Sequence, residues 1–471
     1  MYKDVITVGL MPTRRPVFKF ETAKAEYDII MPIIRAQMPK YVKFVDVDDI
    51  CEGGMGTIPS DIPKVVEKFK AAKVDALFFP FCDFGCEEVV ASVAKQFKLP
   101  VLIWGTRDKV TTYEARQKET QCGLFAATKV LMNYNVKYSY IWNCEPDHPD
   151  FVNGFEKFIR VSSVLKNLRN MNVAEIGDRP RDFYSVIHNQ LALIQNLDIT
   201  VKPIPLAAIT DRANEILAKK DKELTDYYAD FTSRIDCECG GPADYVWKVC
   251  AGTMAIEQLM KEHNCRCAAF DCGGVSRALG MEGGCACAIE GELADRGLPT
   301  ACETDVWGAI SALIASTLSL GEDSPFLADW TYRHPTNDNA ELIWHGAPFA
   351  YSLATKERKP KLHYTEARNR TEPWWEMKQG ELSMLRMDEL NGKYYMFYGA
   401  GKTTTGPETT GTWVWMEVDN WKKWEEKLML SPYIHHVAGI YGKYHDELRE
   451  VCKYLGVQFD PIDDSGPFGL S

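Results

Sequence analysis

Apolar positions in the first third of the chain fall into short continuous runs, and segments with helical apolar spacing separate them. Continuous runs such as residues 76–81 and 101–105 predict buried strands, and residues 62–72 and 87–97 predict amphipathic helices. The complete set of predicted strands here is 5–10, 43–47, 76–81, 101–105 and 138–143. Strands separated by single helices indicate a parallel sheet with right-handed crossovers. We therefore expect an α/β domain over residues 1–168.

The same alternation continues over residues 169–328 and predicts a second αβ, Rossmann-like domain. Its predicted strands are 172–177, 198–205, 268–272 and 299–303, and its predicted helices are 188–197, 206–234, 244–263 and 305–320. The last helix begins just after Glu303, and Asp305 can cap it. The positive end of the helix dipole favours the ionised form of the Glu303 carboxylate.

Beyond residue 330 helical spacing largely disappears, and runs such as residues 381–390, 393–405 and 411–418 predict antiparallel strands. A helix at 443–455 follows them. We expect a β-rich third domain over residues 329–471, which makes the fold class α/β with two αβ domains and a β-rich C-terminal domain.

Candidate metal ligands lie at strand-like runs in residues 299–346 and again near the C-terminus. Glu303, Asp329 and His345 each follow or interrupt a short apolar run, and His435-His436 begins another. A carboxylate in an apolar strand requires a compensating charge. Each residue alone is explained as well by an ion pair or a core histidine. Together, two carboxylates and two imidazoles suit Mn²⁺, Mg²⁺ or Co²⁺ better than a closed structural zinc site.

The pair His435-His436 is predicted to lie in a strand, where neighbouring side chains point to opposite faces. Only one of the two then points straight at a given ion. The other is available to orient substrate or to hydrogen-bond a ligand.

Substrate contacts are expected at the carboxyl ends of the parallel strands. Arg14 and Arg15 follow the first strand, residues 82–84 follow the third, and residues 104–107 follow the fourth. The alternative for each is a solvated loop. Trp413, with its neighbour Trp415, is a candidate for stacking on a sugar, and the alternative for both is packing in the core of the β-rich domain.

The amino-acid composition excludes some classes of binding partner. The net charge of −12, without a stripe of basic residues, argues against nucleic acid. No apolar window reaches the roughly 18 residues of a membrane span, and the N-terminus lacks the apolar core of a signal peptide. Fifteen cysteines then indicate reduced thiols in a cytoplasmic protein. The C-x-C pairs between residues 237 and 302 leave a metal cluster as an alternative, although their spacing differs from the usual C-x₂₋₄-C.

These motifs resemble those of the L-fucose/L-arabinose isomerase family. ACETD (301–305) followed by LADW (327–330) is similar to that family's pair of active-site acids, and ELIWHG (341–346) to the position where arabinose isomerases supply a histidine. IHHVAGIYGKYHDELREVCKYLGVQF (434–459) resembles the family's C-terminal segment. Weaker similarity in residues 120–131 and 175–190 extends the resemblance along most of the chain.

The resemblance implies a barrel-like C-terminal domain, dependence on Mn²⁺, and a homo-oligomer, a trimer or hexamer, in which a neighbour's first domain completes each site. It implies Glu303, Asp329 and His436 as metal ligands. His345 is a fourth ligand if the chain follows the arabinose isomerases, since fucose isomerases do not all use it. The second acid is Asp, as in fucose isomerases, so this mixture of features leaves the sugar open.

The function that follows is interconversion of a free pentose, 6-deoxyhexose or related aldose with its ketose through a cis-enediol. Glu303 and Asp329 would move the proton between C1 and C2, one as base and one as acid. Two alternatives stay open: a sugar-binding homologue without turnover, and a metal-dependent lyase or hydrolase that uses the same residues.

Overall fold

The computed structural model describes residues 5–109, 118–238, 243–281, 284–366 and 370–464. The described chain forms two compact units. One unit comprises residues 5–166 and 446–454, and the other comprises residues 167–445 and 455–464. The predicted three-domain division at residues 168/169 and 328/329 stays a prediction.

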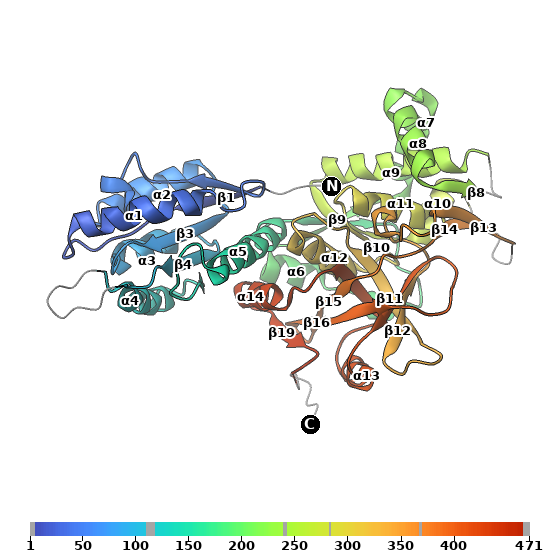
Figure 1. The fold of residues 1–471 in the computed structure, drawn as a ribbon. Coiled ribbons are helices and arrows are strands. Elements are labelled where there is room, and N and C mark those ends of the chain that lie inside the picture. Colours follow the sequence, from blue (N-terminus) through green and yellow to red (C-terminus); the bar gives the residue numbers. More distant parts are fainter. Residues whose placement is uncertain (1–4, 110–117, 239–242, 282–283, 367–369, 465–471) are drawn as a thin grey trace. The chain divides into compact units, whose positions relative to one another are not determined.

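The first unit is a five-stranded parallel sheet with helices between the strands (Figure 1). Its strand order is β2-β1-β3-β4-β5. The strands are β1 (Ile6–Leu10), β2 (Val42–Val45), β3 (Ala76–Phe81), β4 (Val101–Gly105) and β5 (Ser139–Tyr140). The helices are α1 (Phe20–Arg35), η1 (Glu52–Gly54), α2 (Asp61–Ala71), α3 (Glu87–Lys95), α4 (Thr120–Asn133), α5 (Pro149–Leu168) and, from the end of the chain, α14 (His445–Leu455).

Strand β3 shows why its run is apolar at every position. Leu77, Phe79 and Phe81 pack into one core with α2, α3 and α4. Phe78 points the other way and meets Phe155 of α5, with ring centroids 5.8 Å apart. Because helices cover both faces, every residue of the strand is buried.

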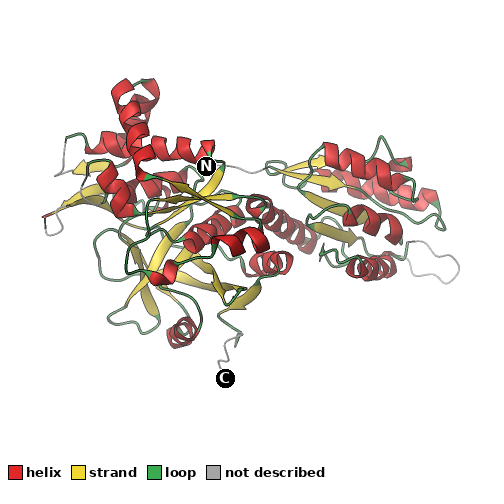
Figure 2. Ribbon diagram, turned by 180° about the vertical axis from the view of Figure 1, so that it is seen from behind, coloured by secondary structure: helices red, strands yellow, loops and turns green. Residues whose placement is uncertain are grey.

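The second unit begins with a four-stranded parallel sheet of order β10-β9-β6-β7. Its strands are β6 (Asn172–Ile176), β7 (Thr200–Ile204), β9 (Cys265–Phe270) and β10 (Thr300–Ala301). Its helices are η2 (Tyr184–Val186), α6 (Gln190–Leu197), α7 (Leu206–Lys219), α8 (Lys222–Arg234), α9 (Tyr245–Glu262), α10 (Cys272–Ala278), α11 (Cys285–Asp295) and α12 (Val306–Leu318). Figure 2 draws these helices in red and the strands in yellow.

The structure changes the bounds of three predicted elements in this region. The helix expected over 206–234 is broken, because Lys220 takes a left-handed conformation and Asp221 caps a new helix. The strand expected over 268–272 begins earlier, at Cys265, and stops at Phe270, where Asp271 caps α10 through the amide of Gly274. The strand expected over 299–303 covers Thr300–Ala301 alone.

The remaining strands form a barrel. In the described chain β16 pairs with both β15 and β17, which closes the ring β15-β18-β11-β12-β17-β16. These strands are β11 (Phe326–Arg333), β12 (Ala340–His345), β15 (Glu381–Leu390), β16 (Lys393–Thr404), β17 (Thr412–Glu417) and β18 (His436–Tyr441). Outside the ring lie β8 (Asp236–Glu238), β13 (Lys361–Thr365), β14 (Arg370–Glu376), β19 (Gln458–Pro461), η3 (Tyr351–Leu353) and α13 (Trp421–Leu430). The predicted fold class, with its barrel-like C-terminal part, is confirmed.

Helix α12 joins the parallel sheet to the barrel. Every residue of it is buried, because it contacts β9 and β10 on the sheet and β15 and β18 on the barrel. A helix that is apolar on all sides needs such cover. Its N-terminus therefore lies where the sheet and the barrel meet.

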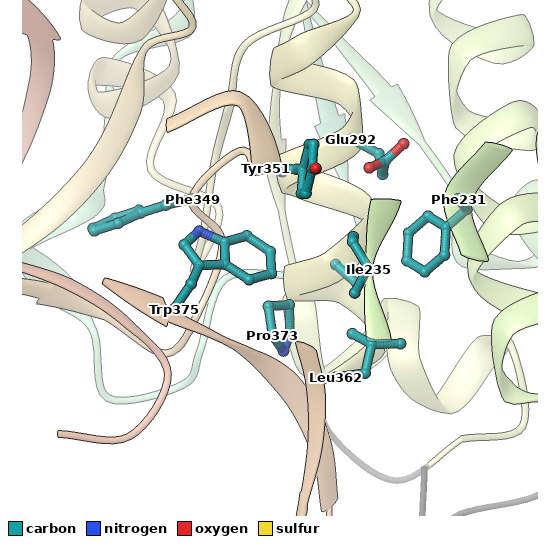
Figure 3. Close-up of a pocket in the computed structure, with 10 residues that line it drawn as sticks. Phe231, Ile235, Glu292, Phe349, Tyr351, Leu362, Pro373 and Trp375 are labelled. Carbon is teal, nitrogen blue, oxygen red and sulfur yellow. The ribbon is translucent and has the colours of Figure 1, made fainter. Parts of the chain in front are cut away.

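A cavity of about 10 Å³ lies between α8, η3 and β14, lined by Phe231, Tyr351 and Trp375 among others (Figure 3). Its lining is apolar except for Glu292, which pairs with Arg234 at 2.9 Å. It has room for about one water molecule, so it is too small for a sugar. None of the described helices combines the length and apolarity needed to cross a bilayer.

Candidate metal centre

The four predicted metal ligands come together where the N-terminus of α12 meets the barrel. Glu303 lies in the turn between β10 and α12, Asp329 in β11, His345 at the end of β12 and His436 at the start of β18. Strand β11 pairs with both β12 and β18. Asp329 is the Cα partner of His436 in one pairing and of Trp344, next to His345, in the other.

Their side chains face one another at short range. His436 Nε2 lies 3.1 Å from Glu303 Oε2 and 3.6 Å from Asp329 Oδ1. His345 Nε2 lies 3.7 Å from the same Asp329 oxygen. One ligand atom each from Glu303, His345 and His436 lies within 4.8 Å of the others, a spacing that a single ion can bridge.

Glu303 reaches this point from an unusual turn. It and Thr304 both have left-handed backbone conformations, with φ of 57° and 58°. The amide of Thr304 donates to Phe270 O at 2.7 Å, which ties the turn to the end of β9. Such conformations are uncommon for residues with a Cβ and concentrate at functional sites.

His435 also lies at the site and offers a ligand atom of its own, whereas the sequence predicted that only one of the two histidines would point straight at an ion. Asp329, His435 and His436 form a second group with ligand atoms within 4.8 Å of one another. Strand β18 begins only at His436, so the alternation of a strand does not govern His435. Its ring centroid lies 4.5 Å from that of His436, and Phe183 packs against both rings at 5.4 and 5.5 Å.

Two residues next to the site were not predicted in this role. Asp305, predicted only as a helix cap, does accept from the Gly308 amide at 2.9 Å, but its Oδ2 also accepts from His436 Nδ1 at 2.9 Å. Arg386 of β15 donates to that same oxygen at 2.7 Å. Arg386 could have been noticed as the one basic residue in the otherwise buried run ELSMLRMDEL.

The buried charges shift the pKa values of this group. Burial opposes ionisation of Asp305, but Arg386 and His436 outweigh it and hold the pKa of that carboxyl far below its usual value. Burial would lower the pKa of His436, yet the hydrogen bonds to Asp305 and Glu303 raise it to about 9. Burial likewise disfavours the Glu303 anion, and His436, His345 and His435 together lower the pKa of Glu303 despite it.

The donor set fits a divalent cation. Asp329 Oδ1 and His345 Nε2 are buried without a hydrogen-bond partner and face each other. Buried polar atoms of this kind call for a missing partner such as an ion or a water. Carboxylate and imidazole donors suit Mn²⁺, Mg²⁺ and Co²⁺.

The two barrel histidines are not equivalent donors. His436 uses Nδ1–H to bond Asp305, so in the neutral ring Nε2 carries the lone pair toward the acids. His345 Nδ1 instead accepts from the Gly346 amide at 2.9 Å. That bond favours a hydrogen on Nε2 of His345, which suits hydrogen bonding to Asp329 better than metal ligation.

The site is open on one side. The Glu303 side chain is 34% exposed and that of Asp329 19%, whereas His436 is fully buried. His435 is exposed. A small polar substrate can therefore approach the two acids, and the histidine behind them is sealed from water.

The two arginines predicted to contact substrate differ in their hydrogen bonding. Arg14, in the first unit, is buried, with Nε and Nη1 unpaired and its guanidinium 5.1 Å from the Phe20 ring centroid. Arg15 instead donates to Gly85 O at 3.1 Å and pairs with Glu87.

Trp413 is 2% exposed and clusters with Leu342 and Trp415. Its burial favours packing in the barrel wall over contact with a sugar. Trp415 is 4% exposed in the same cluster, and the same alternative holds for it.

The cysteines in the described part of the chain are free thiols, and the two candidate ligand groups found there contain none of them. Cys237 is exposed in β8, Cys265 and Cys267 lie in β9, and Cys285 and Cys287 lie in α11. Cys239, from the first C-x-C pair, lies outside the described residues.

Comparison with known proteins agrees with the motifs. Residues 9–169 match the fucose/sulfoquinovose isomerase N-terminal domain, and residues 352–463 match the L-fucose isomerase C-terminal domain, together more than half of the chain. A sulfoquinovose isomerase of Priestia aryabhattai is 22% identical over 96% of this chain and 98% of its own length. One from Alkalicoccus urumqiensis is 22% identical over 86% of this chain and 90% of its own length.

The two domain matches flank the segment that supplies Glu303, Asp329 and His345, and the second includes His436. The family was predicted from ACETD, LADW and the His-His segment, and that prediction is confirmed, as is the prediction of an isomerase. The chain belongs to the fucose isomerase-like family of sugar isomerases.

Proposed function

We propose that this protein is a divalent-metal-dependent isomerase that interconverts a free aldose with its ketose. The observation that carries the proposal is the convergence of Glu303, Asp329 and His436, from three separate elements, around a partly open space. The unpaired Asp329 oxygen at that space supports an ion there.

Glu303, Asp329 and His436 would hold the ion. A bound divalent cation would polarise the sugar carbonyl as a Lewis acid and so acidify the neighbouring C–H bond. Mn²⁺ is the ion to test first, with Mg²⁺ and Co²⁺ as alternatives, because the donors are oxygen and imidazole nitrogen without a thiolate. His345 would contribute its Nε2–H beside Asp329 rather than a fourth bond to the ion.

The two acids would move the proton. One carboxylate takes the proton from C2 of the aldose, which gives a cis-enediolate with its charge on O1. The proton on O2 then moves to O1, and the carboxyl group formed in the first step returns its proton to C1, which gives the ketose. Glu303 and Asp329 both lie within 4 Å of His436 Nε2, so they can flank the same two carbons. Positioned acid–base catalysis of this kind contributes about 10²–10⁴-fold to the rate.

The relatives suggest the sugar. Since the proteins from Priestia and Alkalicoccus are sulfoquinovose isomerases, a 6-deoxyhexose with a sulfonate at C6 is the first substrate to test, followed by fucose and arabinose. Arg14 has unpaired buried donors suited to a hydroxyl or an anionic oxygen. Its contact with the sugar, like the homo-oligomer with shared sites, stays a prediction.

Proton exchange in D₂O tests the proposal directly. The protein would be stripped of metal with EDTA, reloaded with Mn²⁺ and incubated with each sugar, and deuterium at C1 or C2 would be followed by NMR together with ketose formation. We expect exchange that EDTA abolishes and Mn²⁺ restores. Isomerisation conserves mass, so a product of different mass would indicate a lyase or hydrolase instead.

Asp329→Asn and Asp338→Asn make a matched pair of variants for this assay. Both remove one carboxylate from the β11–β12 hairpin, but Asp338 is exposed in its turn and outside the ligand groups. Asp338→Asn should exchange deuterium like the wild type and Asp329→Asn should not. Metal-bound wild-type protein that exchanges no proton on any of the sugars would contradict the proposed activity.

A further inference from the structure

A buried arginine lies directly behind the proposed metal centre, on the side away from the solvent. Arg386 of β15 is 1% exposed. Its Nη1 and Nη2 donate to the two carboxylate oxygens of Asp305 at 2.7 and 3.3 Å, and its Nε donates to Asp388 at 2.8 Å. Nη1 also donates to the backbone oxygen of His436 at 3.3 Å.

These contacts fix Asp305 completely. Oδ1 accepts from the Gly308 amide and from Arg386, and Oδ2 accepts from Arg386 and from His436 Nδ1. An ionised carboxylate has no hydrogen to donate, so the hydrogen in the Asp305–His436 bond belongs to the imidazole. With Nδ1 committed to Asp305, Nε2 is the nitrogen left for an ion, and it faces Glu303 and Asp329.

We propose that Arg386 is a positioning residue for the metal centre: through Asp305 and the His436 carbonyl, it holds the His436 ring in the orientation and tautomer that ligate the ion. The role rests on the proposed metal centre, and Arg386 itself touches neither ion nor sugar. Arg386 contacts His436 in two ways: Asp305 links it to the imidazole, and Nη1 donates directly to the backbone oxygen.

A gain in folding stability alone does not explain the buried ion pair between Arg386 and Asp305. A buried ion pair gains little net stability over apolar residues of the same shape, because desolvation offsets the attraction. Hydrogen-bond partners behind a metal-bound histidine, in contrast, typically contribute about 10–100-fold to metal affinity or activity. Arg386 lies where such a hydrogen-bond partner would act, behind His436 and connected to it through Asp305.

Metal affinity without sugar is the appropriate measurement, since it is independent of turnover. The metal-free protein would be titrated with Mn²⁺, and free Mn²⁺ followed by electron paramagnetic resonance. Arg386→Met removes the guanidinium, and Arg386→Lys keeps the charge but not the two-pronged contact. We expect the dissociation constant to rise about 10–100-fold in Arg386→Met and by less in Arg386→Lys. The Co²⁺-loaded variants should also show a changed visible absorption spectrum.

Arg234→Lys is the matched control. Arg234 also pairs with a buried carboxylate through both of its amino groups, to Glu292 at 3.0 and 2.9 Å, but lies outside the ligand groups. Arg234→Lys should leave the Mn²⁺ dissociation constant within about twofold of the wild type, because the hydrogen bonds of Arg234 to Glu292 and Asp230 reach no metal ligand.

Folded Arg386 variants, judged by circular dichroism, that bind Mn²⁺ as the wild type does and give the same Co²⁺ spectrum would overturn the proposal. If Arg386→Met does not fold, Asp305→Asn decides, because its amide oxygen can still cap α12. Wild-type affinity in Asp305→Asn would likewise overturn it. A wild-type protein that binds no Mn²⁺ at all would instead refute the metal centre itself.

Discussion

Burial of Glu341 in β12 is expected to make the stability of the barrel depend on pH. The residue is 5% exposed, and its Oε2 is buried without a hydrogen-bond partner. The nearest cation, Arg333, is 3.8 Å away and also faces Glu425 at 3.8 Å. Burial raises the pKa of Glu341 from 4.5 to about 7; Arg333 opposes the rise and Glu425 adds to it.

The sign of the effect follows from the direction of the shift. The folded protein binds the Glu341 proton more tightly than the unfolded chain, so the unfolding free energy falls as the pH rises from 4.5 through 7. Each pKa unit corresponds to about 1.4 kcal/mol, so the rise from 4.5 to about 7 lowers the unfolding free energy by about 3 kcal/mol at pH 8.

Glu341→Gln removes the titration and keeps the shape. Urea unfolding of the barrel, followed by tryptophan fluorescence, would be compared for Glu341→Gln and the wild type at pH 5 and pH 8. We expect the variant to gain stability relative to the wild type at pH 8 and little at pH 5. Asp338→Asn, which alters an exposed acid in the adjoining turn, should show no such pH dependence. A gain that is equal at the two pH values would refute the reasoning.

The remaining predictions concern the site and one close contact. Asp329→Asn should lower turnover about 10²–10⁴-fold with an unchanged circular dichroism spectrum, since it removes one of the two proton-transfer groups. Because Nδ1 of His345 accepts a hydrogen bond and that of His436 donates one, His436→Gln should weaken Mn²⁺ binding measured by titration more than His345→Gln. EDTA should lower the melting temperature, and Mn²⁺ should restore it, because an ion that binds only the folded state stabilises it. Gly123→Ala should cost about 1–3 kcal/mol in urea unfolding, since a Cβ there would lie 1.7 Å from Phe84 O.

The local elements were largely predictable because their signals are local. The run at residues 76–81 is apolar on both faces, and it forms the buried strand β3 as expected. The closure of the barrel was not predictable in the same way, since β12 pairs with β17, and β18 pairs with both β11 and β15, through contacts distant in sequence. The resemblance to a family, rather than periodicity, indicated the barrel.

Some residues of the candidate site were predictable from the sequence and others were not, for the same reason. Glu303, Asp329, His345 and His436 are chemically out of place beside apolar runs, so the sequence singled them out. Asp305 already had an explanation as a helix cap, which concealed its bond to His436. Arg386 comes from a strand that β18 separates from β11, and no sequence spacing links it to either acid.

The order of the strands has a consequence for how the protein is made. Glu303 and His436 are 133 residues apart in the chain, and β18 must insert between β11 and β15 before they meet. Such long-range closure comes late in folding, because its entropic cost is met only after the intervening strands are in place. A ribosome that has released residues up to 345 has supplied two acids and one imidazole but not His436. We therefore expect the proposed ion to enter a finished barrel rather than to guide its assembly, so that protein made without metal still folds.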